Sequence, residues 1–500
     1  MRTWMSVLLL LALLVGADAR AEGGEATPPA AEGGSEGAEK KAEEPQEPPV
    51  FVLPEREQGR MEKALFEYLQ PGKKSRADHY KKIEKLVEKK IDGHSLLEDV
   101  VGLESIANHA RLFNAKVGKK GRVNEVKVAP DVHGFPGQIG TVTYDLYLPK
   151  KYTERQLWPL IFCLPDNKKF NDGKSYIEDE WIKRAPEVAE QFLIAVPRPQ
   201  SRGDRWSTPK SLARAMISLR HLLGTYESTA KTGGPAADAT RIFIEGDDVA
   251  AIVAARFSEI FAGAILRGVD GREGKVDLRK GGALAGLPAF CIFNTKKKPQ
   301  KEFAEKVKAA NDATRLVMVD GDDLEGNREA VAKWMAELEV SQQPRRIEYF
   351  VYDGSFQRHY WIVVRDFDAT VKPAPSFRAT ADRARNEVRI DVEGVNRFEL
   401  FLNDALVDLG AKLRIVVTEG EVEYPFYEDT PRRELAGMLE ELLTSNQPWR
   451  IYPVRFLVDL PTLREQLAEA EKAKAAAAPA DADAEKEKEN ASAAKKEAGK

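Results

Sequence analysis

The chain has 500 residues, more than one compact core usually holds, so its length predicts two or three domains. Hydrophobic residues make up 43% of the chain and charged residues 31%, which indicates globular protein with some disordered segments. Its 76 basic and 80 acidic side chains leave a net charge of -4, which does not favour nucleic acid or an anionic membrane surface as a partner.

Both ends of the chain lack the composition of a packed core. Residues 1–21 combine Arg2, an apolar stretch over 7–15 and small residues up to Ala21, which predicts a secretory signal peptide. A retained anchor is the alternative, but the stretch is short for a membrane span. We expect an exported protein with no membrane span beyond this peptide. Residues 22–50 are expected to form a disordered acidic and Pro-rich linker, and residues 466–500 a low-complexity Ala, Lys and Glu tail.

Residues 51–118 have the spacing of amphipathic helices. Apolar residues recur every three or four positions, as at Leu65, Phe66 and Leu69. This pattern predicts a small helical module, either packed against the main domain or forming a lid over it.

Residues 119–343 alternate strand and helix patterns. Two alternating runs, 123–128 and 141–148, predict an antiparallel pair. Continuous apolar runs then follow at 158–164, 192–196, 288–293 and 314–319, with amphipathic helices between them, which indicates a mostly parallel sheet covered on both faces. Cys163 and Cys291 each lie inside such a run, so we expect two separate buried thiols.

After Pro344 the pattern changes to short strands. Five such runs, at 346–352, 359–364, 387–392, 398–402 and 413–417, predict a β-sandwich over residues 344–418. A helix and a last apolar strand follow in residues 419–465, and this segment is expected to dock back on the body of the protein.

The stretch from 241 to 268 organises the sheet. It predicts an apolar strand, a sharp turn at 246–249, an alanine-rich helix and a second buried strand. This layout resembles the nucleophile elbow of secreted bacterial α/β-hydrolases of the esterase and prolyl-oligopeptidase-like group. Residues 346–418 resemble the β-domain that follows the hydrolase domain in many of these proteins. The resemblance implies an α/β fold: a three-layer α/β-hydrolase-like sheet with an N-terminal helical module and a C-terminal β-sandwich.

The catalytic motifs that the resemblance implies are altered in this chain. Asp248 occupies the place of the nucleophilic serine, and Ala250 that of the last elbow glycine. Pro165, which has no N–H, begins the loop that would supply an oxyanion donor. The loop at 294–299 is basic where the acid of the triad should lie, and the loop at 320–326 has no histidine.

These changes leave three hypotheses. The first is a pseudo-hydrolase that has lost the Ser-His-Asp triad and acts as a binding or structural protein, secreted or periplasmic in a bacterium. It would have an unknown extracytoplasmic ligand or protein as its partner. On this hypothesis the protein is not an enzyme, and we expect no cofactor and assign no metal ligands.

The second hypothesis is an active hydrolase that uses Asp248 as nucleophile on an ester, epoxide or halide-type substrate. It requires a histidine to activate water. We expect His133 in a solvated loop, His221 in a capping or surface position, and His359 packed within the β-domain.

The third hypothesis is a cation site at the carboxyl ends of the strands, because the loops there share one edge of an open α/β sheet. Carboxylates suit Ca²⁺ or Mg²⁺, although aspartates are also ordinary turn and capping residues. The candidate ligands are Asp166, Asp247, Asp248, Asp320, Asp322 and Asp323.

Overall fold

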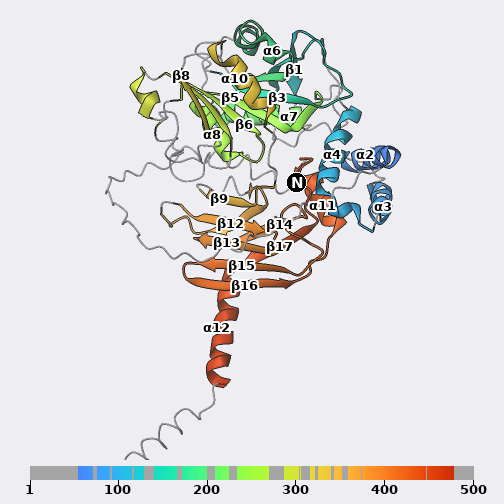
Figure 1. The fold of residues 1–500 in the computed structure, drawn as a ribbon, viewed down its shortest axis with the longest axis vertical. Helices are drawn as coiled ribbons and strands as arrows, with labels where there is room; N and C mark the ends of the chain where they lie inside the picture. Colours follow the sequence, from blue (N-terminus) through green and yellow to red (C-terminus); the bar gives the residue numbers. More distant parts are fainter. Residues whose placement is uncertain are drawn as a thin grey trace, which may run out of the picture.

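The computed structural model describes residues 54–70, 76–90, 93–114, 118–128, 140–165, 172–199, 206, 209–223, 234–269, 287–294, 296–302, 305, 316–320, 325–338, 343–351, 358–372, 374–445 and 447–477. The predicted signal peptide and the predicted 22–50 linker lie outside these residues. The described part forms a sheet domain, a β-sandwich and a group of helices beside them (Figure 1).

The sheet domain is built on eight strands in the order β1-β2-β4-β3-β5-β6-β7-β8. Strands β1, β2 and β4 pair antiparallel, and all pairs from β4 to β8 are parallel. The predicted α/β fold with a large, mostly parallel sheet is therefore confirmed. The strands are β1 (Val123–Val128), β2 (Val142–Tyr147), β3 (Trp158–Leu164), β4 (Leu193–Pro197), β5 (Ala237–Gly246), β6 (Gly263–Arg267), β7 (Ala289–Phe293) and β8 (Leu316–Asp320).

Helices cover both faces of this sheet, which is why its central strands are apolar on both sides. One face packs on α7 (Pro209–Leu223) and α8 (Asp248–Arg256). The other packs on α5 (Gly173–Tyr176), the π-helical turn η6 (Ile177–Ile182), α6 (Pro186–Ala189) and α10 (Arg328–Ala336). Cys163 and Cys291 are buried free thiols in the cores on opposite faces, as predicted. Burial raises the pKa of Cys163 well above its usual value and that of Cys291 to about 12.

The sandwich consists of a five-stranded sheet, β16-β15-β13-β12-β9, and a four-stranded sheet, β10-β11-β14-β17. Their inner faces share one hydrophobic core. Two strands beyond the expected end at residue 418, β16 and β17, complete these sheets. The strands are β9 (Arg346–Phe350), β10 (Arg358–His359), β11 (Ile362–Phe367), β12 (Ser376–Asp382), β13 (Glu387–Glu393), β14 (Val395–Leu402), β15 (Leu413–Glu419), β16 (Val422–Asp429) and β17 (Val454–Asp459).

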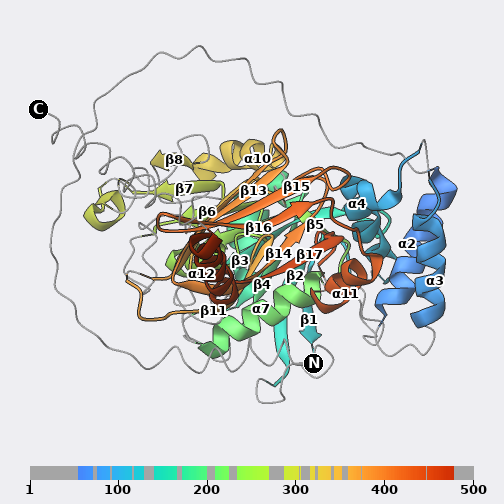
Figure 2. The same ribbon diagram turned by 90° about the horizontal axis from the view of Figure 1, so that it is seen from below.

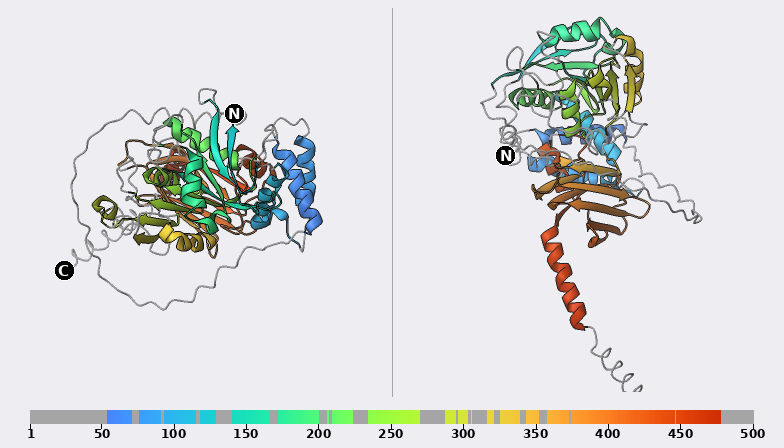
Figure 3. Two further views of the ribbon diagram at one scale, coloured as in Figure 1. Left: turned by 90° about the horizontal axis from the view of Figure 1, so that it is seen from above. Right: turned by 90° about the vertical axis from the view of Figure 1, so that its left-hand side faces the viewer.

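The N-terminal helices and α11 (Leu435–Ser445) form a fourth core. It joins α2 (Glu55–Leu69), α3 (Arg76–Val87), the 3₁₀ turn η2 (Leu96–Glu98) and α4 (Val100–Ala110) with α11. The predicted C-terminal helix thus docks on the N-terminal helices, through Met438, Leu439 and Leu442. The last helix, α12 (Leu460–Ala477), extends away from the sandwich into the predicted low-complexity tail (Figures 1 and 3). Among the described helices, none is long and apolar enough to cross a membrane.

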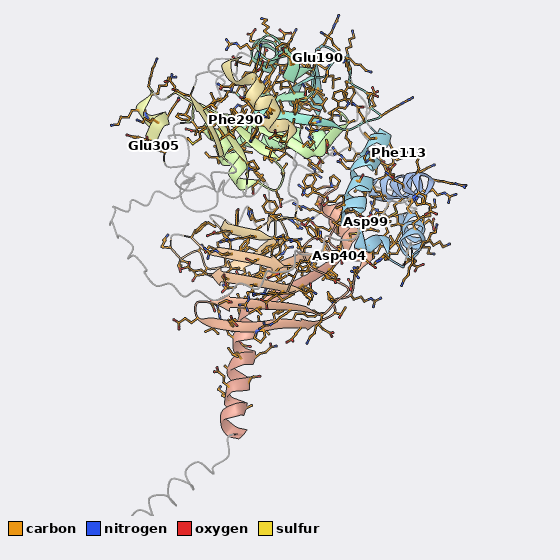
Figure 4. All side chains as sticks on the ribbon, in the orientation of Figure 1. Asp99, Phe113, Glu190, Phe290, Glu305 and Asp404 are labelled. Carbon is orange, nitrogen blue, oxygen red and sulfur yellow. The ribbon has the colours of Figure 1, made fainter. Side chains whose placement is uncertain are left out.

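The helical module and the sandwich both attach to the amino edge of the sheet, the edge at which the parallel strands begin. The 3₁₀ turn η3 (Arg111–Asn114), which carries the Phe113 labelled in Figure 4, places buried Arg111 2.9 Å from the carbonyl oxygen of Ala237, the first residue of β5. Glu259, between α8 and β6, accepts the backbone N–H of Tyr360 at 3.1 Å and a guanidinium N–H of Arg450 at 2.7 Å.

The predicted elbow lies at the other end of the same strand. β5 has 10 residues, so its two ends are separated by about 30 Å at the usual rise of a strand. The helical module therefore packs against the amino edge and not over the carboxyl edge, the edge at which the parallel strands end.

Candidate functional site

The candidate site is the turn from β5 into α8. Gly246 has φ +153, and a Cβ atom there would lie 2.4 Å from the carbonyl oxygen of Leu164 and 2.9 Å from the Cβ of Ala250. Glycine is required because the end of β3 and the first turn of α8 both press against this backbone. Ala250 fits where a larger side chain would not.

Asp247 is the N-cap of α8. Its side-chain Oδ1 accepts the backbone N–H of Val249 at 3.1 Å, which satisfies one of the unpaired donors of the first helical turn. Asp248 is the first helical residue and is buried, with 7% of its surface exposed.

The backbone of this turn differs from that of a nucleophile elbow. An elbow holds its nucleophile on a strained turn. Here, among the non-glycine residues that the structure describes, positive φ angles occur at Tyr360 and Asn386, and the unusual angle of the turn belongs to Gly246. Asp248, the residue predicted at the nucleophile position, therefore has an ordinary helical backbone.

Of the two places where an oxyanion donor is expected, one has another partner, and the structure describes only the first residue of the other. In an α/β-hydrolase one donor is the N–H of the residue after the nucleophile, which is Val249 here and is directed at Asp247. The second donor comes from the loop after β3. That loop begins with Pro165, whose carbonyl oxygen accepts the indole N–H of Trp206 at 2.8 Å. The Asp247 carboxylate thus caps α8, and the Pro165 carbonyl holds the Trp206 indole.

The aspartates predicted as cation ligands are not gathered at one point in the described chain. Asp247 and Asp248 begin α8, whereas Asp320 is exposed at the end of β8. β8 is three strands from β5 in the sheet, a lateral distance of about 14 Å. Within the described ranges, no group of three or more His, Cys, Asp or Glu residues is placed to hold a metal ion. The candidates Asp166, Asp322 and Asp323 lie outside the described residues.

The expectation for His221 was wrong, because this residue is buried. It lies on the inner face of α7, where its Nδ1 is 2.9 Å from the hydroxyl oxygen of Tyr144 on β2. This hydrogen bond allows the polar ring to be buried. β2 is three strands from β5 in the sheet, so His221 pairs with Tyr144 at a distance from the Asp248 turn.

His359 packs within the sandwich, as expected. Its ring stacks on Tyr349 with 4.4 Å between ring centroids, and burial lowers its pKa to about 3. A neutral imidazole in this position is part of a core. His133 lies outside the described residues.

Sequence reasoning missed a buried ionic cluster at the carboxyl edge. Arg267, the last residue of β6, donates from Nε to Glu245 at 2.5 Å and from Nη1 to Glu180 at 2.9 Å. The Tyr176 hydroxyl donates to the other oxygen of Glu245 at 2.5 Å. Burial alone would lower the pKa of Arg267, but the attraction of Glu245, Tyr176 and Glu180 raises it well above its usual value. We call Arg267, Glu245, Glu180 and Tyr176 the Arg267 cluster.

One signal in the sequence could have revealed this cluster. Glu245 and Arg267 are charged residues at the ends of the apolar runs of neighbouring parallel strands, each directly before a glycine. Buried charges are rare unless they are paired, so two of opposite sign at matching positions indicate a pair.

The solved structures that resemble this chain resemble it in fold. An α/β-hydrolase-like fold follows from the strand order, the glycine turn and the helices on both faces. A thermostable esterase structure matches 44% of this chain and 63% of its own, with 16% identity and a TM-score of 0.33. An S-formylglutathione hydrolase from Agrobacterium tumefaciens matches 44% of this chain and 97% of its own, with 12% identity and a TM-score of 0.32.

Esterase 2 of Thermogutta terrifontis gives a similar result, with 44% of this chain and 96% of its own covered, 13% identity and a TM-score of 0.31. Similarities this low carry no argument about chemistry. No protein-family model matches the chain, and no curated protein sequence is similar to it.

Proposed function

We propose that this protein is a pseudo-hydrolase: an exported chain that keeps an α/β-hydrolase-like sheet without the Ser-His-Asp triad and serves as a binding or structural protein outside the cytoplasm. The observation that carries the proposal is the hydrogen bond from the Val249 N–H to the Asp247 carboxylate, 3.1 Å long. An oxyanion forming at this turn would meet a carboxylate in place of a free donor, and like charges repel.

Two further features support the proposal. Asp248 has no nucleophile-type backbone geometry, and Pro165 offers no N–H at the start of the oxyanion loop. We infer that the partner is a ligand or protein outside the cytoplasm. It would present a peptide, ester or glycan surface of the kind that related hydrolases recognise.

The test is hydrolysis of short-chain aryl esters and peptide amides by the purified protein and by Asp248→Ala. We expect the two proteins to give the same background rate. Turnover by the wild type that Asp248→Ala abolishes would contradict the proposal. Asp248→Ser is a sharper control, because it restores a serine to the turn while Val249 still donates to Asp247. We expect it to remain inactive as well.

The alternative with Asp248 as nucleophile is tested with epoxide and haloalkane substrates in the same series. Its ester intermediate needs a water molecule activated by a base such as histidine. His221 is hydrogen-bonded to Tyr144, away from the Asp248 turn. We therefore expect no alcohol or halide release. The cation alternative is tested by melting with added Ca²⁺ or Mg²⁺. We expect an unchanged Tm, and a concentration-dependent rise would favour a cation site.

A further inference from the structure

The four-stranded sheet of the sandwich ends in a strand whose outer edge pairs with no described strand. β17 is last in the order β10-β11-β14-β17 and pairs with β14 on one side (Figure 2). α11 packs near its beginning, where the N–H of Glu434 donates to the carbonyl of Pro453. From Arg455 onward the strand is more open: Leu457 is 55% exposed, the highest value among the large hydrophobic residues that the structure describes.

The hydrogen-bond pattern shows which backbone groups of β17 point outward. The N–H of Phe401 donates to the carbonyl of Trp361, which continues the β11 side of β14. Backbone groups alternate in direction along a strand, so Leu400 and its even-numbered neighbours on β14 face β17. Leu400 pairs with Phe456. The even-numbered residues of β17 therefore bond to β14, and the N–H and C=O groups of 455 and 457 point to the open edge, before the chain enters α12 after Asp459.

The side chains of these three residues share the outer face of the sheet. Val454 and Val458 lie in the sandwich core with Phe456 packed against it, so the alternate residues Arg455, Leu457 and Asp459 face away from it. Their order is basic, apolar, acidic. In an antiparallel pair centred on Leu457, each Arg455 would lie opposite the Asp459 of the other strand, and the two Leu457 side chains would meet on the axis.

We propose that two copies of this chain pair antiparallel through the open edge of β17, with Leu457 on the two-fold axis. The two four-stranded sheets then become one continuous sheet. The arrangement is isologous, because one patch serves as both halves of the contact. Its register is set by two Arg455–Asp459 pairs and by backbone bonds at Leu457.

The neighbours of these residues are compatible with this pairing. Arg455 is 52% exposed beside its intramolecular partner Glu399. Asp459, at 27% exposed, has Oδ2 2.7 Å from Arg397, and its Oδ1 accepts the N–H of Thr462 at 3.3 Å, so Arg455 of the second copy would join an existing cluster. Cross-strand pairs of opposite charge stabilise a ladder, whereas like charges in the same position destabilise it. An unrelated extended peptide would also find the open backbone groups, but a second copy carries the complementary charge order in its own β17.

The register is tested by oxidation of full-chain variants with one added cysteine each, since both native cysteines are buried. In Leu457→Cys the two new residues would form a hydrogen-bonded pair with Cα atoms about 5.5 Å apart, a separation suited to a disulfide. In Arg455→Cys the equivalent residues would lie about 14 Å apart, four residues along the strands. We expect covalent dimers for the first variant and none for the second. The reverse result, or no dimer from either, overturns the proposal.

Association is tested by sedimentation velocity over a range of concentrations. We expect a monomer–dimer equilibrium that Leu457→Lys weakens about tenfold or more, because two ammonium groups would then be opposed on the axis. Val422→Lys is the matched control, since Val422 is an exposed apolar residue on β16, the terminal strand of the other sheet. A wild type that is monomeric throughout, or a dimer that Val422→Lys alone disrupts, would also overturn it.

Discussion

The two edges of the eight-stranded sheet have opposite relations to the rest of the chain. At the amino edge, Arg111 attaches the helical module to the start of β5, and Glu259 attaches the sandwich near the start of β6. At the carboxyl edge, where α/β folds hold ligands, two described polar groups are paired locally: Asp247 caps α8 and Arg267 is enclosed by its cluster. In the described part of the chain, the amino edge connects modules, and the carboxyl edge is closed, with these polar groups paired within the edge.

This contrast is what the proposed pseudo-hydrolase requires, because its sheet would have to persist without a triad. The residues of the carboxyl edge contribute to the folding of their own strands and helices, so they remain under structural constraint even if no substrate is bound. We expect the two edges to differ in the free energy of unfolding that each contributes and in the unfolding transitions that each affects.

The largest effect is expected at the carboxyl edge from Arg267→Met. The change leaves Glu245 and Glu180 buried without their cation, and such a loss costs about 3–5 kcal/mol of unfolding free energy. Chemical denaturation measures it. Arg389→Met is the matched control, because Arg389 pairs with Glu387 and Glu423 but is 43% exposed, and exposed pairs contribute about 1 kcal/mol or less. Equal losses in the two variants would show that the cluster is not a structural element.

A somewhat smaller effect is expected at the amino edge from Glu259→Ala. The N–H of Tyr360 loses the acceptor Glu259, and Arg450 keeps only the longer of its two carboxylate contacts, to Glu441 at 3.3 Å. Such a loss costs about 2–4 kcal/mol for a buried charged group. Because this carboxylate joins two modules, we expect the calorimetric transition to divide into two, with the sandwich unfolding separately from the sheet. Arg267→Met should lower one transition without dividing it. A single transition in Glu259→Ala would argue against an attachment role.

Much of this architecture could be predicted from the sequence, because its signals are local. Period-two and continuous apolar runs indicated the strands of the sheet, and Gly246 marked the turn. β12 was missed because Ala379 and Ala381 give its buried face little hydrophobic contrast. The run that forms β17 was recognised, but its pairing with β14, some 60 residues earlier, has no local signal.

The site was harder to predict than the fold for the same reason. Asp247 could have been read as an N-cap, since aspartate before an alanine-rich helix favours that position. The Arg267 cluster and the burial of His221 depend on partners from other elements, Glu180 and Tyr144. Contacts of this kind cannot be predicted from the spacing of residues along the chain.

A pH-dependent effect is expected where the helical module meets the segment before the sandwich. The carboxyl of Glu104 accepts a hydrogen bond from Gln343 at 3.2 Å, and burial raises its pKa from 4.5 to about 8. Between these values the folded protein holds a proton that the unfolded chain releases. This contribution to stability is therefore complete below pH 4.5 and is lost as the pH rises through 8, with a slope of up to about 1.4 kcal/mol per pH unit.

The measurement is the free energy of unfolding of the wild type and of Glu104→Gln from pH 5 to pH 9. The glutamine cannot ionise, so its curve should be flatter over this range by the slope attributed to Glu104. Parallel curves would show that Glu104 is already ionised and solvated in the folded protein.

The smallest effect, and the one that bears most directly on the turn, is expected from Asp247→Ala compared with Asp248→Ala. Asp247 accepts the Val249 N–H, and loss of such a cap costs about 1 kcal/mol. Asp248 sits in the first turn of α8, where a carboxylate gains about 0.3–1 kcal/mol from the helix dipole. Chemical denaturation should therefore rank Asp247→Ala as the more destabilised, and Asp247→Asn, which keeps an acceptor oxygen, should recover most of the loss. If Asp248→Ala is the more destabilised, or if it alone changes ester turnover, the turn serves Asp248 and the distinction between a connecting edge and a closed edge fails.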